Sequence, residues 1–200
     1  MTTQHLQLVT YKSTGHVLGV FSRVADTGGA STIDTLAPNG IDVIGNLVLS
    51  PPPAGLPPTA AKVHVPQEEL AVQSVLTSPQ LLGSPVYGVA DQGNFVAFPA
   101  GSSAPAVTFP NVNAVRVDTG TAVSPQAVDF WVILLETGST NPQRRVTKGT
   151  LAANGTNAQA QITAEAAASP VVLAPVVAGQ FYDIIALVPG RPVSLSRVQA

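Results

Sequence analysis

The tripeptide Asp-Thr-Gly occurs twice, as Asp26-Thr27-Gly28 and as Asp118-Thr119-Gly120. Two carboxylates held in contact share one proton, because like charges at that distance cannot both ionise, and such a pair can act as general acid and general base. In the alternative interpretation, each Asp caps a tight turn through its side-chain oxygen while the Gly takes the left-handed backbone conformation. The neighbouring residues decide between catalysis and turn formation.

The paired motif superficially resembles a tandem retroviral-type aspartic protease, in which each of two similar halves supplies one Asp-Thr-Gly turn. That resemblance implies a hydrophobic strand leading into each Asp, but Arg23 and Arg116 stand just before Asp26 and Asp118. A guanidinium there keeps its neighbouring carboxyl ionised and prevents proton sharing. Gly29 also stands where a small side chain is expected. We therefore predict two turns and no enzyme, and an aspartic-protease-like hydrolase is the third hypothesis for function.

Other residues that could do chemistry are few. His5 and His16 flank the first expected hairpin and could be cross-strand neighbours, but the three histidines form no tight metal motif. Cysteine is absent, which excludes thiol nucleophiles, thiolate metal sites and disulfides. Arg144 and Arg145 are expected on an exposed hairpin, with an anion site as the alternative. We predict no catalytic residue, no metal site and no cofactor.

The composition is unusually poor in charge. Only 10% of the 200 residues are charged, whereas about 25% is usual, and 45% are hydrophobic. This excludes a disordered chain. The apolar runs are much shorter than the ~20 residues that span a bilayer, and no basic stripe indicates nucleic-acid binding. The first residues carry no basic stretch before an apolar one, so we expect synthesis in the cytoplasm without a Sec signal, and a virion or extracellular particle after release.

Short apolar runs separated by glycine and proline (17 and 18 residues) predict many short strands. The fold class expected is all-β, an antiparallel β-sandwich. A hairpin turn is expected at Thr14-Gly15. The segment 157–168 is left open between helix and strand, because it is alanine-rich but also alternates with period two. The expected strands are His5–Lys12, His16–Val24, Ile41–Leu49, Leu70–Thr77, Val86–Ala90, Phe95–Phe98, Ala127–Glu136, Val171–Leu173, Phe181–Val188 and Val193–Val198.

A weak internal repeat relates the stretch from 75 to 98 to the stretch from 172 to 196, through similarly spaced proline, glycine and valine residues. It predicts two similar tandem units, residues 1–110 and 111–200. A single jelly-roll-like sandwich is the alternative.

Two expected strands are apolar on both faces. A sandwich strand with one face exposed to solvent should alternate between apolar and polar residues. Residues 128–135 and 181–188 do not, so either the chain itself or a partner must cover the second face. We take Trp131, Ile133, Tyr182 and Ile184 as candidates for an assembly interface.

These observations favour a non-enzymatic structural subunit that assembles with copies of itself or with other structural subunits, in a virion, a phage tail or a related particle. The alternative is a ligand-binding β-sandwich module for carbohydrates. Glycan binding normally uses an aromatic platform, for which Tyr11 and Tyr87 are the candidate exposed rings. We expect neither nucleic acid nor membrane as a partner.

Overall fold

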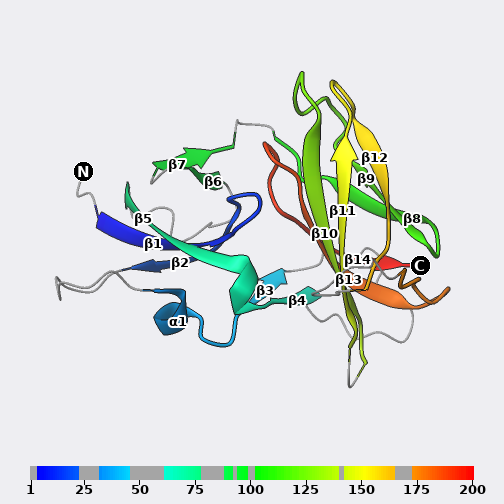
Figure 1. The fold of residues 1–200 in the computed structure, drawn as a ribbon, viewed down its shortest axis with the longest axis horizontal. Coiled ribbons are helices and arrows are strands. Elements are labelled where there is room, and N and C mark those ends of the chain that lie inside the picture. The colour runs from blue at the N-terminus through cyan, green and yellow to red at the C-terminus, as the bar shows by residue number, and fades with distance from the viewer. Residues whose placement is uncertain are drawn as a thin grey trace. The chain divides into compact units, whose positions relative to one another are not determined.

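The computed structural model describes residues 4–22, 32–45, 61–77, 88–91, 94–98, 102–139, 142–164 and 173–200 (Figure 1). The fold is all-β with antiparallel strand pairing, as the sequence predicts. The chain divides into two compact units, Met1–Val43 with His64–Ser102, and Ile44–Val63 with Ser103–Ala200. The division therefore falls at 102/103 rather than at 110/111, and an early segment of the chain belongs to the second unit.

The first unit is built around a sheet of order β2-β1-β5. Its hairpin turn places Gly15 at φ 71°, a left-handed conformation that glycine adopts without a steric penalty, as the sequence predicts. Leu6, Leu8, Val17 and Val75 form its core cluster. The elements of this unit are β1 (Gln4–Tyr11), β2 (Val17–Ser22), α1 (Ile33–Leu36), η1 (Gln67–Glu69), β5 (Leu70–Thr77), β6 (Gly88–Asp91) and β7 (Asn94–Ala97).

A two-stranded sheet joins β3 (Ile41–Gly45) to β4 (Ala61–Val65). The division between the units runs through both strands. In β4, buried and exposed side chains alternate, and Ala61, Val63 and Val65 are the buried ones. This alternation is the pattern of a strand with one covered face.

The second unit is a β-sandwich of two sheets, with orders β11-β10-β13-β14 and β12-β9-β8. Phe130, Val132 and Leu134 from the first sheet and Val115 and Val117 from the second belong to one buried cluster, so the sheets face each other across a shared core. The strands are β8 (Ala106–Asn111), β9 (Ala114–Asp118), β10 (Val128–Glu136), β11 (Arg144–Leu151), β12 (Asn157–Gln161), β13 (Phe181–Leu187) and β14 (Ser194–Gln199).

Strands with long apolar runs lie where the sequence predicts them. The observed β5 has the expected bounds, and β10, β13 and β14 agree within one residue at each end. The segment 157–168, for which the sequence did not decide between helix and strand, contains a strand, β12, over its first five residues. The strands β4, β8, β9 and β11 were not predicted. The expected strand Val171–Leu173 lies mostly outside the described residues, and its last residue forms an isolated bridge with Thr163.

The sheets of the two units differ in strand order. The strands β1 and β10 each lead into a Thr-Gly turn, at Thr14-Gly15 and at Thr137-Gly138, as two repeated units would require. In the structure β1 lies between β2 and β5, whereas β10 lies between β11 and β13. The similarity of the two units therefore stays a prediction.

Candidate functional site

The four expected interface residues lie on opposite faces of one sheet. Pairing of β10 with β13 sets Leu134 opposite Ile184 and Ile133 opposite Ile185. Tyr182 and Ile184 consequently belong to the sandwich core, while Trp131 and Ile133 lie on the outer face. The four side chains cannot form one surface, which corrects the expectation. A shift of one residue in register exchanges the two faces of a strand, so this arrangement depends on the pairing.

The chain itself covers much of that outer face. Ile133, Ile185 and Leu187 are fully buried. The start of β4 lies over β13, because the backbone N–H of Lys62 donates to Asp183 Oδ2 at 3.1 Å, and both neighbours of Lys62 are buried. Asp183 is in turn held by Arg197, whose Nε and Nη2 donate to its two carboxylate oxygens at 2.6 and 3.0 Å. The doubly apolar strands thus give no reason to expect a partner.

Trp131 is half-buried at the open part of the same face. The ammonium of Lys148 lies 5.2 Å from its ring centre and 2.5 Å from Asp129 Oδ2. Thr150 donates to the other oxygen of Asp129 at 2.8 Å. The hydrogen bonds from Lys148 and Thr150 lower the pKa of Asp129. This pair therefore favours the folded state above the ordinary pKa of the carboxyl, and the contribution is lost as the pH falls.

The basic pair lies in a strand, where the donors of Arg145 bind the protein's own backbone. Arg144 and Arg145 lie in β11 rather than in a hairpin loop, and Arg145 is buried. Its Nε donates to the carbonyl oxygen of Ala174 at 3.1 Å, and its guanidinium lies 5.5 Å from the ring centre of Tyr182. Arg144 is half-buried and also has an interaction partner. Since the donors of Arg145 serve backbone carbonyls, the guanidinium of this residue fixes the segment from Leu173 onward.

The second Asp-Thr-Gly motif forms a turn, as predicted. Asp118 Oδ1 accepts a hydrogen bond from the N–H of Gly120 at 2.8 Å, and Gly120 has φ 69°. Thr119 is buried, and its hydroxyl donates to the carbonyl oxygen of Thr156 at 2.8 Å. The first motif, at Asp26, lies outside the described residues. The geometry of the second motif is that of a structural Asx turn.

The histidines and the candidate aromatic platform are placed by strand register. His5 pairs with Leu76, so it is not a cross-strand neighbour of His16, which is buried beside Thr14. Tyr11 is buried, and Tyr87 lies outside the described residues. Within the described ranges, no group of three or more His, Cys, Asp or Glu is placed to hold a metal ion. The helices described there are too short and too polar to cross a membrane.

One end of the second unit exposes large apolar side chains. Val112 is 37% exposed in the β8–β9 turn, and Leu173 and Val177 are 53% and 59% exposed. Backbone hydrogen bonds place the segments that carry them side by side. Val176 N–H donates to the carbonyl oxygen of Val112 at 2.8 Å, and Ala174 N–H donates at 3.1 Å to that of Ile162, whose own N–H donates to the carbonyl oxygen of Asn113 at 2.9 Å. We call Val112, Leu173 and Val177 the apolar end.

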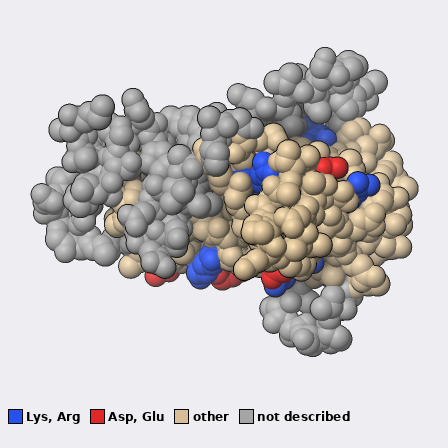
Figure 2. Space-filling view, turned by 90° about the horizontal axis from the view of Figure 1, so that it is seen from above, with Lys and Arg blue, Asp and Glu red and all other residues tan. Residues whose placement is uncertain are grey.

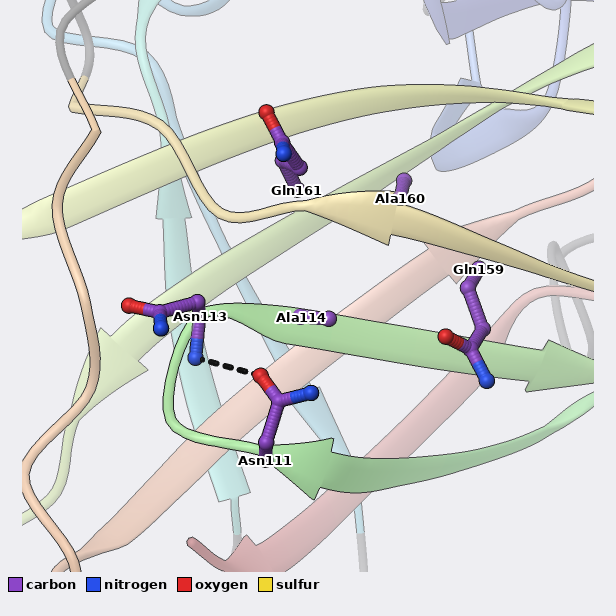
Figure 3. Close-up of a pocket in the computed structure, with 6 residues that line it drawn as sticks. All are labelled: Asn111, Asn113, Ala114, Gln159, Ala160 and Gln161. Carbon is purple, nitrogen blue, oxygen red and sulfur yellow. Dashed lines mark hydrogen bonds between the residues drawn. The ribbon is translucent and has the colours of Figure 1, made fainter.

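Figure 3 shows the residues that line a hollow rich in carboxamides. The hollow adjoins the apolar end, because Val112 stands in the chain between the lining residues Asn111 and Asn113. It has a volume of about 320 Å³. Ala114 on β9 lies between the β8–β9 turn and β12, which together supply the carboxamides. None of its lining residues is charged. The lining residues are Asn111, Asn113, Ala114, Gln159, Ala160 and Gln161.

Sequence reasoning missed both features. The exposed valines and leucine resemble core residues in a chain that is hydrophobic throughout. The carboxamides have one sequence signal, the alternation of Asn157, Gln159 and Gln161 with alanines, which places all three on one face if the segment is a strand. The partners of this face on β8 and β9 are not visible in the sequence.

Comparisons with protein-family models, with curated proteins and with solved structures find no match for this chain. The function proposed below therefore depends on the surface of the second unit.

Proposed function

We propose that this chain is a non-enzymatic structural subunit, which docks onto copies of itself or onto partner subunits of a larger assembly through the apolar end. The observation that carries the proposal is the exposure of Val112, Leu173 and Val177 at one end of the sandwich. Burying such side chains fully is worth about 1.5–3 kcal/mol each, so their partial exposure leaves a substantial gain for a contact. Clustered exposed apolar side chains commonly mark protein–protein contacts.

The low charge of the chain supports the same proposal. Across the described part of the face in Figure 2, charged side chains are scattered and most of the surface is uncharged. A surface with few charges needs little desolvation of ions when it docks, and desolvation is a main cost of association. A virion, a phage tail or a related particle is the setting that we propose, because repeated contacts between subunits add many weak interfaces together.

The first test measures association with and without the apolar end. We expect light scattering after size-exclusion chromatography to show a mass that rises with concentration for the wild type. The double variant Leu173→Asp/Val177→Asp should weaken this association at least tenfold, since it places charge in the contact. A tenfold change corresponds to about 1.4 kcal/mol.

The matched control is Ile44→Asp. Ile44 is 63% exposed but lies on β3, so the control matches each of the two substitutions in charge change and in apolar surface lost, while the location differs. A wild-type chain that stays monomeric at its highest soluble concentration, alone and with co-expressed neighbouring gene products, would refute the proposal. Equal weakening by the control and by the double variant would refute the assignment to the apolar end.

A further inference from the structure

The carboxamide-lined hollow arises from the register of three strands. Gln161 pairs with Ala114 across β12 and β9, and Ala114 pairs with Asn111 across β9 and β8. The methyl group of Ala114 therefore lies between two longer side chains and leaves an unfilled space above it. Gln159 and Gln161 are exposed on β12, while Ala160 between them points into the core. On the outer face of this sheet, the small side chain of Ala114 thus lies at the bottom of the hollow, with carboxamide side chains on both sides of it.

The backbone around the hollow is held in place. Ile162 N–H donates to the carbonyl oxygen of Asn113 at 2.9 Å, and Asn113 N–H donates to Asn111 Oδ1 at 2.9 Å. The hydroxyl of Thr147 on β11 donates to the carbonyl oxygen of Gln161. These bonds connect the turn, β12 and the facing sheet. Side chains on such a backbone lose less entropy when a ligand binds than side chains on a loose loop.

The carboxamides retain most of their hydrogen-bonding capacity. Apart from Asn111 Oδ1, the side-chain amide groups of Asn111, Asn113, Gln159 and Gln161 make no hydrogen bond with the described residues. Each free carboxamide offers an NH₂ with two donors and an oxygen that accepts. A sugar ring presents adjacent hydroxyl groups that both donate and accept, which matches this set. No lining residue is charged, and Arg116, which pairs with Gln159 beside the hollow, already has Asp118 at 3.8 Å as its ion-pair partner. An uncharged ligand is therefore favoured, because a charged one would lose hydration without a free ion-pair partner in the lining.

We propose that this hollow is a binding site for a neutral glycan, which it holds through hydrogen bonds between carboxamides and sugar hydroxyl groups. The volume of 320 Å³ lies near the lower limit of ligand sites, which run from about 300 to 1,000 Å³, so it accommodates a short sugar segment. The lining contains no aromatic ring on which a sugar could stack. We therefore expect a single site to bind with a Kd on the order of 1 mM.

The experiment uses the full chain labelled with ¹⁵N and titrated with maltotriose, cellotriose and N,N′-diacetylchitobiose, with sialyllactose as a charged comparison. We expect at least one neutral oligosaccharide to shift the amide signals of residues 111–114 and 159–161 in a saturable manner. The variant Ala114→Leu should weaken this binding at least tenfold, because its side chain points outward and fills the hollow. Double replacement Gln159→Ala/Gln161→Ala should have the same effect.

Asn157→Ala is the matched control, since Asn157 is an exposed carboxamide on the same strand that does not line the hollow. It should bind like the wild type. Unchanged melting temperatures of all three variants exclude unfolding as the cause. No saturable shift with any neutral oligosaccharide, or equal binding by Ala114→Leu and the wild type, would overturn the inference. Because the assembly test uses different residues, either proposal can fail while the other stands.

Discussion

Replacing Asp183 by alanine will lower the free energy of unfolding of the second unit by about 3–5 kcal/mol, the usual cost of removing one partner from a buried ion pair. The carboxylate is 7% exposed and its partner Arg197 is 3% exposed. The variant removes the carboxylate to which Nε and Nη2 of the buried Arg197 donate. It also removes the acceptor for the Thr137 hydroxyl, at 3.1 Å, and for the backbone N–H of Lys62, which holds the start of β4 on the sheet.

Urea unfolding followed by tryptophan fluorescence measures this loss. The chain has a single tryptophan, Trp131, and it lies on β10, so the signal reports the second unit and not the first. This matters because a chain of two units need not unfold in one step. The control is Asp129→Ala, which removes an exposed ion pair with Lys148 from the same sheet and should change the stability far less.

A second comparison separates the buried charge from the pair as a whole. The double variant Asp183→Leu/Arg197→Met removes both charges, so it should recover much of the stability lost in Asp183→Ala. If Asp183→Ala and Asp129→Ala unfold at the same urea concentration, then the buried pair stabilises the unit no more than the exposed pair does, which contradicts the prediction.

Replacing Gly149 by alanine will destabilise the second unit by about 1–3 kcal/mol through overpacking of its core. Gly149 pairs with Phe130 across β11 and β10. A Cβ atom on Gly149 would lie 2.6 Å from Phe130 Cε1 and 2.9 Å from the Cβ of Ala160, both closer than real contacts allow. Phe130 is fully buried, so its ring cannot turn away into solvent. The same fluorescence-detected unfolding measures the effect.

A double-mutant cycle tests the stated cause. Phe130→Leu alone should destabilise the unit, because it leaves a cavity. In the background of Phe130→Leu, the substitution Gly149→Ala should lower the free energy of unfolding much less, or even raise it. The difference from its effect in the wild type is the coupling energy between the two sites. If the two changes were simply additive, the clash with Phe130 would not be the source of the loss.

Local features of the sequence determined the fold class and several of its parts. Apolar runs between glycine and proline predicted the strands at Leu70–Thr77 and Phe181–Leu187 within one residue. The turns at Gly15 and Gly120 were also predictable, because a positive φ angle at glycine and an Asx turn at Asp118 depend on neighbouring residues alone. Interactions over a few residues set these features, so the sequence reveals them without knowledge of strand pairing.

The strand β11 was not predicted because its apolar content is low. In each strand of the sandwich, every second side chain points away from the shared core. In β11 the buried side chains on the core side include the polar residues Arg145 and Thr147. These polar groups are tolerated because distant backbone carbonyls accept their hydrogen bonds, at Ala174 for Arg145 and at Gln161 for Thr147. The local sequence pattern does not reveal a hydrogen-bond acceptor that lies many residues further along the chain.

Register was decided by the tertiary structure alone. It places Tyr182 and Ile184 in the core and Ile133 on the opposite face, although all three belong to equally apolar strands. It also brings Gln161, Ala114 and Asn111 into one row and so creates the hollow. The sequence by itself determined the fold class, the strands with long apolar runs and the turns at Gly15 and Gly120. Which side chains meet across strands was settled only when the two sheets closed on their shared core, because a shift of one residue would reverse every face.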